Sequence, residues 1–244
     1  MDSSLQHLAD KAIRHAIDSG AEYSDVRVEQ QEKKSVLIEN GEIEYVRSDS
    51  STGIGIRLVK AGTWSFCSIT NPNSSEQIIE LVNEALRNSS HYTKNKKNKI
   101  SLYPNAVNKT KIDFPVLKKP ELEELIKIGF ECNKIISDTP RIIKSIVNPW
   151  YTTNSKYFVN SEGSEIVQNF TDVIVDMIAT AHESGLTQSI NITEGGRGGL
   201  ELIIDKNKIQ QSAQEIALKA SQLIDAKPAK EEKATVIMNP DFVS

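Results

Sequence analysis

Apolar and polar residues alternate with two different periods along the first 90 residues. From Ser3 to Ile17 the apolar residues recur at spacings of three and four, which predicts an amphipathic helix. Period-two alternation follows between Val26 and Phe66 and predicts four short strands. A capping box, Ser74-x-x-Gln77, then opens a second amphipathic helix. The pattern therefore predicts one unit of helix, four strands and helix, ending near Asn88.

The turn signals agree with this order. Asn40-Gly41 favours a type I′ hairpin between the segments Val36–Ile38 and Ile43–Tyr45. Gly20 suits the left-handed residue that commonly ends a helix. We therefore expect the strands of this unit to pair antiparallel.

The same order recurs from Pro120 to Asp225. A helix is predicted after Pro120, and a closing helix is predicted with Asp205 as its N-cap. Gly163 follows Gly41 by 122 residues and Gly185 follows Gly62 by 123, which indicates a true internal repeat. The four strands predicted in this unit are Ile142–Trp150, Lys156–Asn160, Glu165–Ile178 and Gly185–Ile192.

Two polar segments flank the second unit. Residues 91–119 include the basic run Lys94–Lys99 and are predicted as a linker, with the run in solvent rather than on an acidic partner. Residues 228–244 are predicted as a second linker and a strand that begins at Ala234. The expected fold class is α+β, with repeat units at 1–90 and 120–227, followed by the first strand of a truncated C-terminal domain.

Composition narrows the class of protein. The chain has 244 residues, of which 38% are hydrophobic and 25% charged, as in an ordinary soluble globular protein. Its net charge of −4 disfavours a nucleic-acid surface, and no apolar run approaches the roughly 18 residues of a membrane span. Two cysteines, Cys67 and Cys132, give no disulfide framework or metal spacing. We therefore expect a cytoplasmic protein with no nucleic-acid or membrane partner.

His182-Glu183 resembles the beginning of a zinc-binding H-E-x-x-H helix. The second histidine of that motif is missing, because Leu186 occupies its position, and the segment alternates as a strand does. His7 and His15 are eight residues apart on the first helix, a poor spacing for a shared metal. The sequence therefore predicts no catalytic residue and no metal ligand in this chain.

The segment Gly195-Gly196-Arg197-Gly198-Gly199 is the one unusual stretch. Four glycines allow a backbone with positive φ or a close approach of another chain, and Arg197 could bind a carboxylate through two hydrogen bonds. The alternative, which we favour, is a long flexible loop at a sheet edge. These five residues are the only candidates for a substrate-binding or interface loop.

Four motifs resemble the TldD/PmbA family of metallopeptidases, in the same order along the chain. The motifs are Gly20–Glu29, Asn40–Glu44 followed by Ser51–Arg57, Gly62–Phe66, and the glycine segment through Glu201. The final segment, Val236–Ser244, is similar to the strand that precedes an H-E-x-x-x-H helix in TldD-type members. The resemblance covers essentially the whole chain, which is identified as the N-terminal part of a TldD-type subunit.

This resemblance implies zinc-dependent hydrolysis of short or unfolded peptides by the full-length protein. The two zinc histidines and the general-base glutamate would lie beyond Ser244, so this chain alone is expected to bind no zinc and to be inactive. Its expected role is to shape the substrate enclosure, and exposed hairpin edges could bind substrate by strand addition. Family members form homodimers, or heterodimers with a paralogous subunit.

Two alternatives remain open. The chain could belong to a non-catalytic partner subunit or peptide-binding module of the same family, which residues after Ser244 would decide. Modulation of nucleic acid or of gyrase is a second function for which members of this family are named. The negative net charge of the chain disfavours it.

Overall fold

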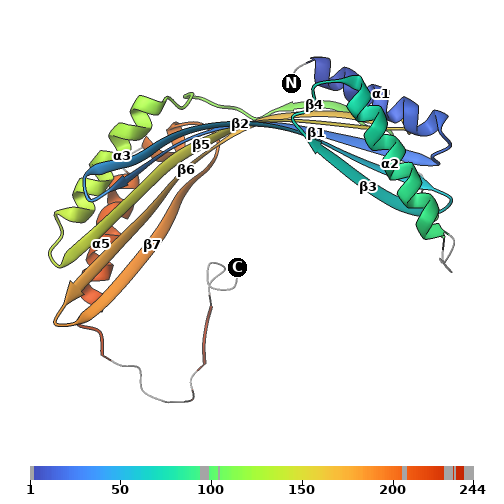
Figure 1. The fold of residues 1–244 in the computed structure, drawn as a ribbon. Coiled ribbons are helices and arrows are strands. Elements are labelled where there is room, and N and C mark those ends of the chain that lie inside the picture. The colour runs from blue at the N-terminus through green and yellow to red at the C-terminus, as the bar shows by residue number, and fades with distance from the viewer. Residues whose placement is uncertain are drawn as a thin grey trace.

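The computed structural model describes residues 3–93, 99–103, 105–204, 208–227, 233 and 235–238. Its elements, in chain order, are α1 (Ser3–Asp18), β1 (Tyr23–Glu39), β2 (Glu42–Lys60), β3 (Thr63–Thr70), α2 (Ser75–Thr93), β4 (Lys109–Asp113), α3 (Leu122–Ser137), β5 (Ile142–Asn160), β6 (Glu165–Glu183), β7 (Leu186–Arg197), α4 (Glu201–Ile204) and α5 (Lys208–Leu223). Figure 1 shows one arched sheet with a pair of long helices at each end. The predicted α+β class is confirmed.

The sheet has seven strands in the order β3-β2-β1-β5-β6-β4, and β7 also pairs with β6. All pairs are antiparallel except β4 with β6, which is parallel. Because β1 pairs with β5, the two repeat units share one continuous sheet. The units therefore join through the backbone pairing of two central strands, from Asp25 with Asn160 to Glu39 with Ile146.

Each unit contains three strands of its repeat, where the sequence predicted four. Val26–Val28 and Val36–Ile38 belong to one strand, β1, and Ile142–Trp150 and Lys156–Asn160 belong to β5. The prediction split these strands because their centres, such as Gln30–Lys34, carry no apolar alternation. A strand whose centre is exposed to solvent on both faces shows no period-two alternation of apolar and polar residues.

The repeat itself has a clear axis. The pairing of β1 with β5 centres on Glu32 and Thr153, which lie 121 residues apart, as do the strand ends Glu39 and Asn160. A residue that pairs with its own equivalent lies on the twofold axis that relates the two units. Next to this pair, Gln31 Nε2 donates a hydrogen bond to the Oδ1 atom of Asn154 at 2.9 Å.

Two hydrophobic cores lie at opposite ends of the sheet, on the same face of β1. Val26 and Val28 pack in the core under α1 and α2, whereas Val36 and Ile38 pack in the core under α3 and α5. All four side chains are fully buried, and all occupy even positions of one strand, so they point to one face. No helix of the described residues covers the opposite face of the sheet (Figure 1).

Part of the expected linker 91–119 is a strand. Lys109–Asp113 forms β4 beside Glu165–Asn169 of β6. Its five residues alternate Lys, Thr, Lys, Ile, Asp, which is too short and polar to separate from a loop by pattern alone. Most of the basic run, residues 94–98, lies outside the described residues, as does the predicted N-cap Asp205.

The predicted caps and turns are confirmed where the structure describes them. Asn40 and Gly41 both have positive φ, 49° and 84°, as a type I′ turn requires. Gly20 has a φ of 86°, and the Gln77 amide N–H reaches Ser74 Oγ at 3.4 Å. These local signals act through neighbouring residues only, which is why the sequence was sufficient to locate them.

Of the strand predicted from Ala234, only Thr235–Met238 are among the described residues, and these four residues form no strand. The described residues Thr235–Met238 pair with nothing in the part of the chain that the structure covers, and Ile237 is 94% exposed. A strand needs a neighbour for its hydrogen bonds, and this segment has none here.

Candidate functional site on the helix-free face of the sheet

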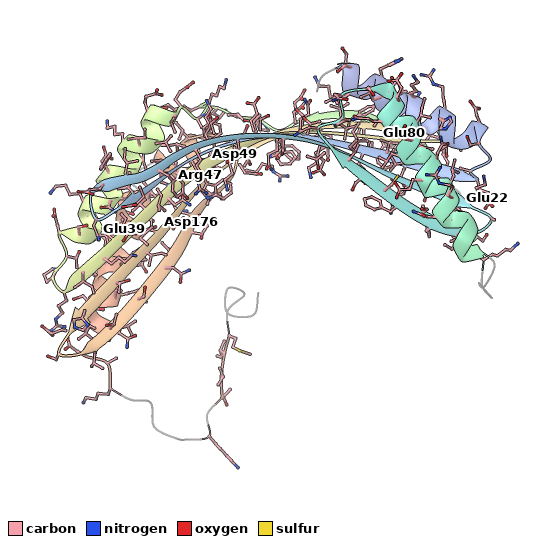
Figure 2. The ribbon with its side chains drawn as sticks, viewed as in Figure 1. Glu22, Glu39, Arg47, Asp49, Glu80 and Asp176 are labelled. Atoms are coloured by element: carbon pink, nitrogen blue, oxygen red, sulfur yellow. The ribbon has the colours of Figure 1, made fainter. Side chains whose placement is uncertain are left out.

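The face of the sheet opposite the helices carries charged and aromatic side chains in rows. They come from odd positions of β1, β2 and β7 and from even positions of β3, β5 and β6, because paired residues share a face. Figure 2 shows Arg47, Asp49 and Asp176 among the side chains on the underside of the arch. We call this surface the helix-free face.

Six cations on the helix-free face lie over aromatic rings. The pairs are Arg27 over Phe158 at 5.1 Å, Lys33 over Trp150 at 4.4 Å, Arg47 over Tyr45 at 4.0 Å, Arg57 over Trp64 at 5.2 Å, Lys156 over Phe170 at 5.8 Å, and Arg197 over Phe170 at 4.0 Å. A cation within about 6 Å of a ring centroid is attracted to the ring face. The rings thus hold the long cationic side chains flat against the sheet.

A buried carboxylate fixes two of these cations. Asp25 is fully buried, and its Oδ2 atom accepts hydrogen bonds from Arg57 Nε at 3.0 Å and Nη2 at 2.7 Å. Its Oδ1 atom accepts a hydrogen bond from Arg27 Nη1 at 2.6 Å. The hydrogen bonds to Asp25 raise the pKa of Arg57 further above its usual value. Both guanidinium groups are therefore held in place by Asp25, with almost half of each side chain exposed.

Two shallow hollows meet at Arg27 on this face. The larger, of about 280 Å³, lies over Gly53 and Gly55 and is bounded by Phe66. The smaller, of about 210 Å³, lies beside Phe158. Arg27 and Glu29 line both, so a charged pair separates two partly apolar recesses. Such an arrangement suits neighbouring side chains of an extended ligand.

The glycine segment is not the flexible loop we favoured, because its first half is strand. Gly195, Gly196 and Arg197 end β7, opposite Ile174, Val173 and Asp172 of β6. Gly195 has a φ of 127°, and a Cβ atom there would lie 2.0 Å from the Val173 carbonyl oxygen. A side chain at this position would force the two strands apart.

Arg197 lies on the helix-free face and is already engaged. Its Nε atom donates to Asp172 Oδ1 at 3.1 Å, and its guanidinium lies 5.1 Å from the Phe114 ring as well as over Phe170. Its side chain is 46% exposed. Arg197 therefore presents a positioned charge to solvent at the junction of β4 and β7.

The second half of the glycine segment is held by Glu201. This carboxylate accepts hydrogen bonds from the backbone N–H groups of Gly199 at 2.7 Å, Lys118 at 2.8 Å and Leu117 at 3.3 Å. A Cβ atom on Gly199 would lie 2.0 Å from the Lys118 carbonyl oxygen. Close backbone approach therefore explains this glycine.

Glu201 gives a testable dependence of stability on pH. Partial burial acts to raise its pKa, but the backbone hydrogen bonds from Gly199, Lys118 and Leu117 outweigh it and lower the pKa below 4.5. A lowered folded-state pKa contributes stability above the unfolded value, and that contribution disappears as the pH falls through the folded value. We expect Glu201→Gln to be less stable at pH 7 and to lose less stability below about pH 4.5. Urea titrations between pH 7 and pH 3 measure this, with exposed Glu162→Gln as control. Parallel pH profiles for wild type and Glu201→Gln would contradict it.

No metal centre is formed by the residues described. Among them, no group of three or more His, Cys, Asp or Glu residues could hold a metal ion. His182 Nδ1 lies 2.8 Å from Thr187 Oγ1 across a hairpin, and His15 Nε2 lies 2.8 Å from Asn83 Oδ1. Burial raises the pKa of the Cys67 and Cys132 thiols to about 12. The side chains present do not fit a zinc site.

The cationic–aromatic rows were missed by sequence reasoning. Their signal exists, because charged and aromatic residues occupy the positions of opposite parity to the buried ones, as in Lys156-Tyr157-Phe158. The register between strands decides which cation lies over which ring, and the sequence of a single strand does not determine that register.

Sequence profiles of one family match most of the chain. A profile described as PmbA/TldA metallopeptidase domain 1 matches residues 24–89. A profile described as PmbA/TldA metallopeptidase central domain matches residues 115–224.

Two archaeal metalloproteases are similar over nearly the whole chain. One, from Methanothermobacter thermautotrophicus, is 24% identical over 235 residues, covering 93% of this chain and 48% of the relative. The other, from Methanocaldococcus jannaschii, is 28% identical over 225 residues, covering 91% and 49%. The chain thus spans about half the length of the curated relatives it matches.

Three crystal structures have the same fold. A candidate modulator of DNA gyrase from Thermotoga maritima gives a TM-score of 0.68 at 14% identity, covering 89% of this chain and 49% of that one. Another, from Bacteroides thetaiotaomicron, gives 0.71 at 15%, covering 90% and 51%. TldE from Thermococcus kodakarensis gives 0.61 at 13%, covering 89% and 47%. At these identities the similarity shows the fold alone.

Proposed function

This chain belongs to the PmbA/TldD family of metallopeptidases, and on that premise we propose that it is the scaffold half of a zinc-dependent metallopeptidase subunit. The subunit would hydrolyse peptides or unfolded chains, and the helix-free face would form one wall of the substrate enclosure. The observation that carries the proposal is the pair of family profiles on residues 24–89 and 115–224. Similarity to two named metalloproteases supports the hydrolase class.

The metal ligands would lie outside this chain. The described side chains hold no cluster that fits a metal, and the relatives are about twice as long. A metal bound by the rest of the subunit would activate water for peptide hydrolysis. We assign no catalytic step to the residues present, whose role is to bind and orient an extended chain.

The helix-free face suits that role physically. Its cations are fixed by Asp25, Glu29 and Asp172, so little side-chain entropy is lost when a peptide binds beside them. The hollow over Gly53 and Gly55 offers room for an apolar side chain next to a charge. Arg197 would contribute a further charge on the same face, over the Phe170 ring that it shares with Lys156.

The surrounding context is part of the proposal. We propose a cytoplasmic protein that forms a homodimer, or a heterodimer with a paralogous subunit, and that binds neither nucleic acid nor membrane. No helix among the described residues is long and apolar enough to cross a membrane. Two fold relatives are described as candidate gyrase modulators. Salt-dependent binding of duplex DNA by this protein would contradict the absence of a nucleic-acid partner.

A peptidase assay tests the proposal. The 244-residue chain is expected to bind no stoichiometric zinc and to cleave nothing. The gene product extended past Ser244 should cleave unstructured peptides and lose activity when the metal is chelated. In that longer protein, Gly53→Val should raise KM about tenfold by filling the hollow. The protein itself has room for the side chain, because a Cβ atom at residue 53 would lie no nearer than 4.0 Å to its neighbour, the Ile69 carbonyl oxygen. Arg197→Ala should weaken turnover as well.

The matched control is Ser51→Val, which places the same side chain on the same strand and face but outside the hollow. Unchanged kinetics in Gly53→Val and Arg197→Ala would remove the helix-free face from substrate binding. Zinc binding and cleavage by the 244-residue chain alone would overturn the scaffold assignment. The alternative of a non-catalytic partner subunit would be favoured if the residues after Ser244 lack His-Glu-x-x-x-His.

A further inference from the structure

Within the part of the chain that the structure describes, one edge of the sheet is unpaired in the first unit and paired in the second. Residues Glu42–Ser51 of β2 pair with β1 on one side, and β3 begins its pairing only at Gly53. Among the described residues, no strand pairs with the outer side of Glu42–Ser51. All of these residues are exposed except Tyr45, which is partly buried.

The internal repeat shows what fits such an edge. The strands β2 (Glu42–Lys60) and β6 (Glu165–Glu183) are equivalent, with an offset of 123 residues at both ends. Val46 pairs with Val36 and Val167 pairs with Tyr157, and Val36 and Tyr157 are 121 residues apart, so Val46 is equivalent to Val167. By the same registers Glu165–Asn169 of β6 corresponds to Ile43–Ser48 of β2, which has one more residue because of the register shift there. In the second unit this edge is occupied by β4, which runs parallel to β6. The first unit has no counterpart of β4 in the described chain.

The backbone groups of the open edge point outward. In β6, the Asn169 carbonyl accepts a hydrogen bond from the Phe114 N–H at 2.9 Å, which places it on the β4 side. Ser48 is the equivalent residue in β2. The Thr52 carbonyl accepts the Asn71 N–H at 2.7 Å on the same outer side, and strand alternation gives Val46 the same direction. Val46 thus has an N–H and a C=O ready to pair.

The charge of the edge selects among possible strands. Glu42, Glu44 and Asp49 outnumber Arg47, so the open segment is acidic. In the filled counterpart, Lys109 of β4 stands opposite Glu165, which is the first residue of β6 as Glu42 is the first residue of β2. A segment with lysine or arginine at alternate positions would match both the backbone and the charge.

We propose that Ile43–Ser48 of β2 is a strand-acceptor site for an extended basic peptide segment, which pairs in parallel as β4 does on β6. The proposal rests on the proposed function, because it names the class of peptide that the scaffold would retain. Backbone pairing gives affinity for any extended chain, and the acidic edge gives preference for basic ones.

The test is direct binding of a labelled peptide, measured by fluorescence anisotropy. The probe is Asn-Lys-Thr-Lys-Ile-Asp-Phe, the sequence of residues 108–114, and the comparison peptide carries glutamate at both lysine positions. We expect the basic peptide to bind more tightly at low salt, with the difference reduced in 0.5 M salt because the charges are exposed. Equal binding of both peptides at low salt would overturn the charge preference.

Val46→Pro is the decisive variant. Proline removes the outward N–H but leaves the β1 ladder intact, and proline is tolerated at sheet edges. Loss of edge hydrogen bonds should weaken binding about three- to tenfold. Val46→Ala retains the N–H and should change binding less than twofold. If Val46→Pro does not fold by circular dichroism, a peptide N-methylated at alternate residues makes the same test on the wild-type protein.

Three results would overturn the proposal. Unchanged binding in Val46→Pro would place the peptide elsewhere, including the β6 edge in competition with β4. Tighter binding after truncation at Lys227 would indicate that the chain's own Thr235–Met238 occupies the site. Conversion of a dimer to a monomer by Val46→Pro, without any peptide binding, would assign the edge to self-association. The binding assay does not measure hydrolysis, so its result can be interpreted even if the peptidase proposal fails.

Discussion

Gly195→Ala is expected to lower the free energy of unfolding by about 3 kcal/mol or more. A Cβ atom at this position would lie 2.0 Å from the Val173 carbonyl oxygen and 3.0 Å from the Ile174 Cα atom, both in the backbone of β6. The φ of 127° is also one that residues with side chains rarely adopt. Neither problem can be relieved by a change of side-chain rotamer, so β7 must separate from β6.

Displacing β7 would disturb more than one residue. Glu194, the preceding residue, accepts hydrogen bonds from Lys208 Nζ at 2.7 Å and Ser212 Oγ at 2.7 Å, which attach β7 to α5. Arg197 at the end of the strand would lose its position beside Asp172. We therefore expect Gly195→Ala to loosen both the hydrophobic core under α3 and α5 and the part of the helix-free face around Arg197.

Urea denaturation followed by circular dichroism measures the effect of Gly195→Ala. Gly185→Ala is the matched control, because Gly185 also has a positive φ, 81°, but no atom within 4 Å of its added Cβ. That control should lose only about 1 kcal/mol, the cost of a left-handed backbone for alanine. Equal losses in the two variants would show that close approach of the strands is unimportant.

Asn133→Leu is expected to cost about 2–4 kcal/mol, because it leaves a buried amide hydrogen without a partner. Asn133 is 1% exposed on α3. Its Oδ1 atom accepts the Gly41 N–H at 2.8 Å, and its Nδ2 atom donates to the carbonyls of Ile38 at 3.3 Å and Ser145 at 3.2 Å. One side chain therefore fastens the β1–β2 hairpin turn to the second unit.

The surrounding contacts show why this loss would spread. The Asn40 N–H donates to the Ser145 carbonyl at 3.0 Å, and Asn40 Oδ1 accepts the Ser145 N–H at 2.9 Å. At the other end of β1, the Ser161 N–H donates to the Ser24 carbonyl at 2.8 Å, which is the repeat-related equivalent. Each hairpin turn is thus anchored to the other unit, and Asn133 supplies the buried part of one anchor.

Urea denaturation and amide hydrogen exchange of Gly41 measure the effect of Asn133→Leu. Asn191→Leu is the control, because Asn191 is exposed on β7 and its replacement should change stability by less than about 0.5 kcal/mol. Asn133→Asp should be less destabilised at low pH than at pH 7, since a charged carboxylate would face two carbonyl oxygens. A wild-type exchange rate at Gly41 in Asn133→Leu would contradict the assigned contact.

Many residues of the candidate site could not be predicted from the sequence, and the reason can be identified. Arg197 was selected because it lies among glycines, yet the glycines serve close packing of β7 on β6 and of residues 117–118 on α4. Arg27, Phe158 and Asp25 were not selected, although they meet on the helix-free face. Asp25 and Phe158 are 133 residues apart in the sequence, and only the pairing of β1 with β5 brings them together.

The amino-acid sequence by itself determined the helices, the hairpin turns, the α+β class, the twofold repeat and the family. These depend on short-range patterns: apolar spacing, capping residues and the positive φ of Asn40-Gly41 and Gly20. Only the tertiary structure decided that the units share one sheet, that strands continue through polar centres such as Gln30–Lys34, and that β4 pairs with one edge while no described strand pairs with the equivalent edge. Pairing between distant strands and burial by helices elsewhere in the chain control those features. Neither leaves a periodic signal in the segment that it organises.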